Sequence, residues 1–137
     1  MRKRTQAREF ALQILYQVDI THDNCDAALD NFWLHTEDNI DGAIKNFTND
    51  LVRGAVDNLE EIDSQITQYA ANWQLKRMAV VDRNVLRISC YELLYRSDIP
   101  PKVSINEAVD LAKKFSGPEA GKFVNGILDK IKQEKKA

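Results

Sequence analysis

The chain has 137 residues, 44% of them hydrophobic and 29% charged, and its net charge at pH 7 is −2. This length suits one domain, residues 1–137, that buries a core without disulfides or metal ions, and the composition is that of a globular protein rather than a disordered one. No stretch approaches the roughly 18 to 20 apolar residues of a membrane helix, and the basic N-terminus lacks the apolar run of a secretory signal, so we expect a cytoplasmic protein.

Charge is unevenly distributed along the chain. Between Asp19 and Asp63 there are twelve acidic residues against only Lys45 and Arg53, and such a segment repels phosphate. Both ends of the chain are basic. If the ends meet in space they form one basic face suited to a polyanion, and otherwise they are solvated helix surface.

The first predicted helix runs from about Thr5 to Ile20, where apolar residues recur at three- and four-residue steps. A turn-rich stretch at Thr21–Asn24 follows, and then a short helix that the acidic link from Glu37 to Asp41 ends. The apolar anchors of this short helix are Leu29, Phe32 and Trp33.

The next apolar pattern extends from Phe47 to Trp73 and predicts either one long helix or two consecutive helices. Asn58 and Glu61 have the spacing of a capping motif and mark the place for a fresh start. Gly54 lowers helix propensity by about 1 kcal/mol relative to alanine, which indicates close packing against a neighbour or a tolerated surface glycine.

The run from Met78 to Tyr95 is apolar on almost every side, which predicts a central helix or one covered by a partner, including a second copy of the chain. Two prolines at 100–101 end it. Ser104 and Glu107 have the spacing of a capping box, so the next helix is expected to open at Ile105.

The residues Ser116-Gly117-Pro118 stop that helix and begin another, which has proline in its first turn. No alternating strand pattern occurs anywhere in the sequence. The predicted fold class is therefore all-α, a compact bundle of about six or seven helices.

The sequence contains no recognisable catalytic constellation. His22 and His35 do not sit with cysteines or carboxylates at metal-ligand spacing, and there is no glycine-rich phosphate loop. Cys25 and Cys90 are far apart in sequence. We therefore expect a binding protein that has no metal and no cofactor, rather than an enzyme.

Single-stranded RNA is usually held by cations that track phosphates, by aromatic faces that stack on bases and by amides that read base edges. The chain offers each kind: the cations Arg2, Lys3, Arg4 and Arg8 at the start and Lys122 near the end, the rings of Tyr16 and Phe123, and the amide of Asn125. The alternatives are that both rings belong to the core and that the amide only packs between helices.

Several segments resemble a known family. The C-terminal part of the chain is similar to the C-terminal signature of the NusB family of bacterial transcription antitermination factors. The similar residues are INEAV, LAK and F before the break at Ser116-Gly117-Pro118 and KFVNGILDKI after it. The segments AREFALQILYQ, FTNDLVRGAVDNLEEIDSQI and DRNVLRISCYELLYRSDIP resemble the same family in the same order. The resemblance covers nearly the whole chain, and its most specific part is KFVNGILD.

This resemblance implies an all-helical protein that binds the boxA sequence of nascent ribosomal RNA transcripts together with NusE, a small-subunit ribosomal protein, and helps RNA polymerase resist termination. It places the arginine-rich motif at Arg2 to Arg8, the RNA-facing tyrosine at Tyr16, and a second RNA patch at Glu119 to Asn125. The chain departs from the family pattern at Ala120-Gly121, where many relatives have a polar pair, and in its shorter arginine cluster. Both departures predict weaker RNA binding or an altered base preference.

The partner surface is predicted on the central helix. Asp82 occupies the position that resembles the family's NusE-contacting acid, and its neighbours in the predicted contact are Arg83, Leu86 and Tyr91. Complementary charge speeds association with a basic protein, and apolar anchors supply affinity. The alternative is a capping or intrahelical role for Asp82.

Two other functions remain open from the sequence. NusB-like domains also form the N-terminal part of ribosomal RNA cytosine methyltransferases, although such an enzyme needs a further domain for S-adenosylmethionine, and we do not expect one in 137 residues. A helical interaction module without an RNA role is favoured if the basic residues lie on different faces.

Overall fold

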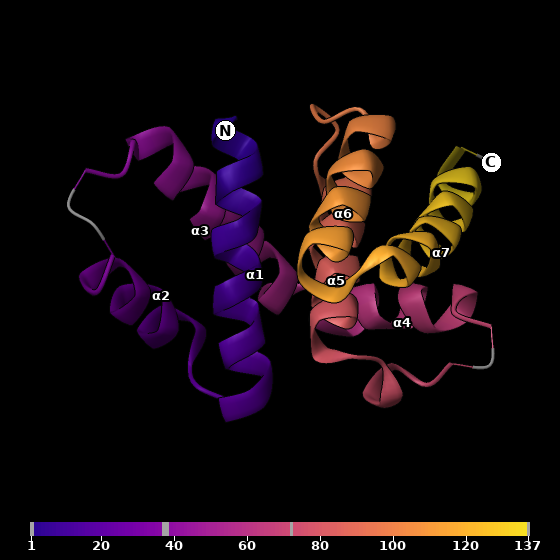
Figure 1. Ribbon diagram of the computed structural model, residues 1–137, viewed down its shortest axis with the longest axis horizontal. Coiled ribbons are helices and arrows are strands. Elements are labelled where there is room, and N and C mark those ends of the chain that lie inside the picture. Colours follow the sequence, from indigo (N-terminus) through magenta and orange to yellow (C-terminus); the bar gives the residue numbers. More distant parts are fainter. Residues whose placement is uncertain (1, 37–38, 72, 137) are drawn as a thin grey trace.

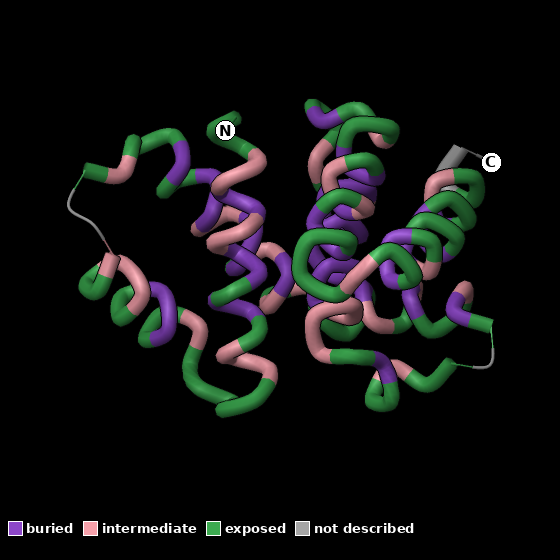
Figure 2. Tube along the Cα trace, viewed as in Figure 1, coloured by how far each residue is buried: buried purple, intermediate pink, exposed green. Residues whose placement is uncertain are grey.

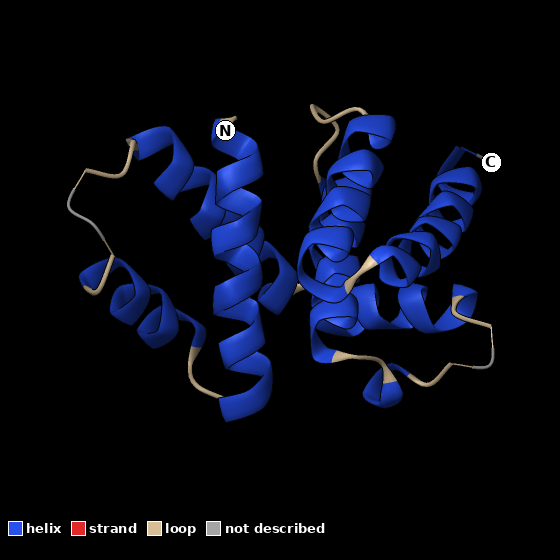
Figure 3. Cartoon of the chain, viewed as in Figure 1, coloured by secondary structure: helices blue, strands red, loops and turns tan. Residues whose placement is uncertain are grey.

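The computed structural model describes residues 2–36, 39–71 and 73–136, with side chains up to residue 134. These residues form seven α-helices, one 3-10 turn and no strand (Figures 1 and 3). The elements are α1 (Lys3–Thr21), α2 (Cys25–Leu34), α3 (Gly42–Asp57), α4 (Leu59–Tyr69), η1 (Leu75–Arg77), α5 (Val80–Tyr95), α6 (Pro101–Ser116) and α7 (Pro118–Lys136). The prediction of an all-α fold is confirmed. The predicted end of α2 falls partly on Glu37 and Asp38, which lie outside the described residues.

The helix α5 is the centre of the molecule. It packs against α1 and α3 on one side and against α4, α6 and α7 on the other (Figure 1). Residues 84–93 are buried without interruption, and Figure 2 shows this burial where the two groups of helices meet. The prediction of a central helix is confirmed. The other helices of the same chain cover α5, so homodimerisation through its apolar surface is not supported.

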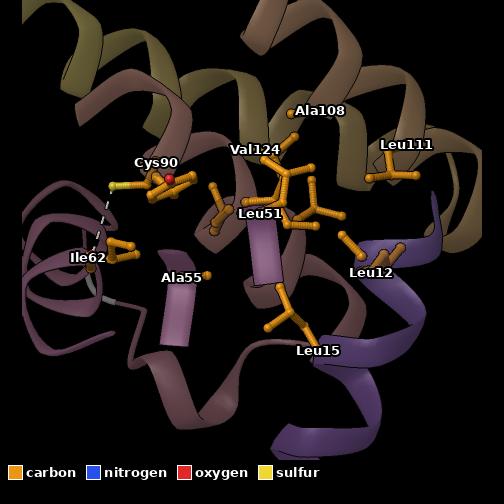
Figure 4. Packing of buried hydrophobic residues seen from close by; sticks show 14 of the residues in the cluster. Leu12, Leu15, Leu51, Ala55, Ile62, Cys90, Ala108, Leu111 and Val124 are labelled. Atoms are coloured by element: carbon orange, nitrogen blue, oxygen red, sulfur yellow. Dashed lines mark hydrogen bonds between the residues drawn. The ribbon is translucent and has the colours of Figure 1, made fainter. Parts of the chain in front are cut away.

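Buried residues of all seven α-helices form the hydrophobic core, and Leu75 of the 3-10 turn packs against it. Figure 4 shows side chains from six helices converging around α5. The labelled members are Leu12 and Leu15 of α1, Leu51 and Ala55 of α3, Ile62 of α4, Cys90 of α5, Ala108 and Leu111 of α6, and Val124 of α7. Each predicted helix thus contributes apolar residues to one shared core.

The long apolar pattern in the middle of the chain forms two helices, α3 and α4, which meet at Asn58. The predicted cap is wrong in detail, because the Asn58 amide donates backwards to the carbonyl of Gly54 at 2.9 Å and makes no cap hydrogen bond to α4. Close packing at Gly54 is confirmed, since a Cβ placed there would lie 2.2 Å from the ring of Tyr91. The helix α4 ends at Tyr69, so Trp73 lies in the connection to η1 instead of continuing the stripe.

The predicted start of α6 is also wrong. The helix opens at Pro101, which is suited to a first turn because proline has no N–H to leave unpaired. Ser104 is therefore inside the helix, and its hydroxyl lies 2.9 Å from that of Ser89 in the core. The predicted break between α6 and α7 is confirmed, with Gly117 at a φ of 103°.

No described helix combines the length and the apolar composition that crossing a membrane requires. Within the described residues, no group of three or more His, Cys, Asp or Glu side chains is arranged to hold a metal ion.

Candidate RNA and partner surfaces

Three of the predicted phosphate-binding cations lie exposed at the beginning of α1. Lys3 pairs with Asp41 at 2.9 Å, and Arg4 lies 3.8 Å from Asp98 and stacks over the ring of Phe47, with 4.5 Å from its guanidinium carbon to the ring centroid. The hydrogen bond from Lys3 lowers the pKa of Asp41. Exposed ion pairs of this kind are weak and exchange readily, so Arg2, Lys3 and Arg4 remain available to an anion.

The fourth predicted cation, Arg8, is buried with 3% of its surface exposed. Its guanidinium donates to both carboxylate oxygens of Glu92 at 2.8 and 2.7 Å, and Glu107 lies 3.5 Å away. The reason is helical spacing: Arg8 shares the face of Ala11 and Leu12, which the core covers. The expectation that Arg8 contacts RNA is therefore wrong.

Tyr16 lies exposed on α1, with 41% of its surface accessible. It borders a hollow formed with Leu12, Gln13, Val81 and Phe115, which joins α1 to the start of α5 and the end of α6. Phe115 is 43% exposed. Tyr16 is thus accessible, as an RNA-stacking role requires, and Phe115 is an aromatic neighbour that sequence reasoning missed.

The first turns of α7 carry the second predicted patch. Glu119 and Lys122 are exposed, with 3.7 Å between the carboxylate and the ammonium, and Asn125 is also exposed. Phe123 is half-buried, and its ring meets that of Trp73 edge to face, with 5.8 Å between centroids. Sequence reasoning did not include Trp73 in the site.

The two residues of the departure at Ala120-Gly121 are both buried. Ala120 is buried, and a Cβ at Gly121 would lie 2.7 Å from Cγ of Lys113. The Lys113 side chain therefore lies close over the α7 backbone. A larger residue at Gly121 would displace that lysine chain.

The two basic ends of the chain do not form one continuous face. The helix α6 lies between the first turns of α1 and the C-terminal part of α7, and it packs against both (Figure 1). Lys114 of α6 pairs with Glu9 of α1 at 3.0 Å. The side chains of Lys135 and Lys136 lie outside the described residues. The cations therefore form separate groups, one at the start of α1 and one around the junction of α6 and α7.

On the predicted partner surface, Asp82 lies half-buried in the first turn of α5. Its Oδ1 atom is buried and has no hydrogen-bond partner among the described side chains and backbone. The carboxylate is well placed near the positive end of the helix dipole, but the cap of α5 is Ala79 and uses no side-chain hydrogen bond. The capping alternative is therefore not supported.

The predicted neighbours of Asp82 are less accessible. Arg83 donates to both oxygens of Asp19 at 2.6 and 2.9 Å. Burial alone would raise the pKa of Asp19. The hydrogen bonds from Arg83 and Asn84 outweigh this effect and lower that pKa. Leu86 and Tyr91 are buried. Both side chains pack inside the core of this chain, so the expectation that these two residues contact a partner is wrong.

The chain is similar to known proteins over nearly its whole length. A model of the NusB family matches residues 5–133. The transcription antitermination protein NusB of Thermodesulfovibrio yellowstonii is 41% identical over 140 residues, which cover 96% of this chain and 93% of the relative. The NusB protein of Anaeromyxobacter sp. (strain Fw109-5) is 48% identical over 129 residues, which cover 94% of this chain and 89% of the relative.

Solved structures show the same fold. The structure of T. maritima NusB is 37% identical with a TM-score of 0.86, covering 98% of this chain and 92% of that one. A crystal structure of the antitermination factors NusB and NusE in complex with dsRNA is 32% identical with a TM-score of 0.86, covering 98% of each chain. Because the family model, the sequence identities and the fold all agree, this chain belongs to the NusB family.

Proposed function

We propose that this protein is a non-enzymatic transcription antitermination factor. It binds boxA-type single-stranded RNA in nascent ribosomal RNA transcripts as a heterodimer with NusE, and the complex helps RNA polymerase resist termination in the cytoplasm. The antitermination role of its relatives supports the role proposed here, and the structure of NusB and NusE in complex with dsRNA supports NusE and RNA as the two kinds of partner. The observation that carries the proposal is the exposed ring of Tyr16, which borders a hollow that Phe115 also lines.

The proposed RNA surface keeps most of the predicted residues. Cations at the start of α1 attract phosphates without regard to sequence, and exposed rings stack on unpaired bases. The Glu119 carboxylate and the Asn125 amide supply the acceptors and donors that read base edges. The proposed contacts are Arg2, Lys3, Arg4, Tyr16, Glu119, Lys122, Phe123 and Asn125, and Arg8 holds the helix that presents the first four.

The proposed partner surface is smaller than predicted and centres on Asp82. A buried carboxylate oxygen without a hydrogen bond is unfavourable, because burial removes its water without a replacement. A cation from a basic partner next to this carboxylate would relieve that cost. Arg83 contributes by holding α5 against α1 through Asp19.

The proposal is tested by fluorescence anisotropy of a labelled boxA-like single-stranded RNA, with a scrambled RNA as the control, in the presence and absence of the cognate NusE protein. We expect binding that prefers the boxA-like sequence and becomes tighter when NusE is added. Binding that is equal for both RNAs and indifferent to NusE would reduce the protein to a basic helical module and overturn the proposal.

A further inference from the structure

Among the described tryptophans and tyrosines that are not proposed RNA contacts, Trp73 is the most exposed. It lies between α4 and η1 with 55% of its surface accessible, and its ring meets the half-buried ring of Phe123 edge to face at an interplanar angle of 73°. Aromatic pairs favour this arrangement because the positive edge of one ring meets the negative face of the other. Phe123 therefore supports the indole from α7 while leaving much of it open to solvent.

The charges around Trp73 fit a polyanion. Lys76 and Arg77 follow it in η1, and both are exposed, with no carboxylate partner among the residues that the structure describes. Lys122 is adjacent to Phe123 on α7 and is exposed. Lys76 and Arg77 differ from Lys3 and Arg4, which already have acidic partners within the chain. Exposed aromatic rings together with cations are the combination by which proteins hold single-stranded nucleic acid.

The η1 connection also joins Trp73 to the rest of the RNA surface. It leads directly into α5, where Val81 borders the hollow beside Tyr16. Arg83 donates to the carbonyl of Lys76 and to Asp19 of α1, which ties the connection to the helix that carries Tyr16. The connection that carries Trp73 is thus tied, through Arg83 of α5, to the helix that carries Tyr16.

We propose that Trp73 is a base-stacking residue for the same RNA, with Phe123 as the residue that positions its ring. This inference rests on the proposed RNA binding and extends the binding surface from α7 onto the connection between α4 and α5. A protein ligand is the alternative occupant of an exposed tryptophan. The exposed cations Lys76 and Arg77, which follow Trp73 in the same connection, disfavour a basic ribosomal protein and favour phosphate, so we assign the position to RNA.

The first test uses the intrinsic fluorescence of Trp73. The only other tryptophan, Trp33, lies on α2, on the opposite side of the molecule from this connection (Figure 1). Trp33→Phe leaves Trp73 as the single reporter, and stacking on a base should quench its emission as boxA-like RNA is added. An unchanged emission at saturating RNA would overturn the inference.

The second test compares affinities by anisotropy. Trp73→Ala should weaken binding about fivefold to tenfold, the lower part of the range for a stacked base because Phe123 already covers part of the ring. Trp73→Phe should keep the affinity within about twofold, since a phenyl ring still stacks. The log–log salt dependence should be unchanged in both variants, whereas Lys76→Ala should flatten it by up to about 0.7 for each phosphate that the protein no longer neutralises.

The outcomes separate this inference from the proposed function. If the unmodified protein does not bind boxA-like RNA, the proposed function fails. If it binds and Trp73→Ala binds equally well, only the inference fails. If Trp73→Ala weakens binding only when NusE is present and the emission of Trp73 responds to NusE instead of RNA, the residue contacts the protein partner and the inference is overturned. Circular dichroism of each variant verifies that the fold is unchanged.

Discussion

Replacing Arg8 with alanine should lower the free energy of unfolding by about 3–5 kcal/mol, the cost of leaving one partner of a buried ion pair alone. Glu92 is 1% exposed, and two hydrogen bonds from Arg8 satisfy both of its carboxylate oxygens. Without the guanidinium, that carboxylate stays buried without a counter-charge beside Glu107. Because domains are typically stable by about 5–15 kcal/mol, the loss is a large part of the total.

Two variants make this prediction specific to the ion pair. Arg4→Ala removes an arginine one turn earlier on the same helix, but its side chain is exposed, so the free energy of unfolding should be nearly unchanged. The double replacement Arg8→Met with Glu92→Leu removes both charges and keeps apolar volume. It should recover most of the stability lost in Arg8→Ala, because a buried pair replaced by apolar groups is often neutral or better.

The assay is urea unfolding followed by circular dichroism, with RNA affinity measured on the same preparations under native conditions. The reasoning is refuted if Arg8→Ala is as stable as the unmodified protein and its RNA binding is weakened with a flatter salt dependence. That result would place Arg8 at the RNA surface, as the sequence alone suggests.

Four further expectations follow from the structure. Gly54→Ala should destabilise the protein by about 1–3 kcal/mol in thermal unfolding, because the new methyl group would overlap a tyrosine ring of α5, whereas Gly126→Ala, with open space around it, should be neutral or stabilising by up to about 1 kcal/mol. Burial, together with two nearby carboxylates, raises the pKa of the Cys90 thiol from 9.0 to about 12. The folded state therefore keeps a proton that the unfolded chain releases. The contribution of Cys90 to the free energy of unfolding should be fully present below pH 9 and be lost as the pH rises toward 12. Cys90→Ala should flatten that decline in urea titrations at several pH values. Asp82→Lys should weaken NusE binding in a pull-down or calorimetric titration and leave RNA binding without NusE intact; an equal loss of both would contradict a partner role. Arg4→Ala should weaken RNA binding and flatten its log–log salt dependence by up to about 0.7, and an unchanged slope would remove the start of α1 from the site.

The features that the sequence predicts correctly depend on near neighbours along the chain. Apolar residues at helical spacing locate the helices, and the Gly117-Pro118 break locates the junction between α6 and α7. The burial of α5 follows from its lack of a polar face. The sequence indicates either close packing or a tolerated surface glycine at Gly54, and the structure shows the close packing. Helix formation and its interruption are local events, so local residues suffice to predict them.

The partners of individual side chains are decided by tertiary structure. The sequence predicts a surface cation at Arg8, but its counter-ion Glu92 lies 84 positions away. It predicts a helix cap at Ser104, whose hydroxyl instead meets Ser89 in the core. It places Trp73 in a buried stripe, but α4 ends four residues before it and leaves the ring exposed beside α7. A charge or a ring is the same in the sequence whether it faces water or another helix. Only the packing of distant helices determines which polar groups are satisfied inside and which remain free to bind.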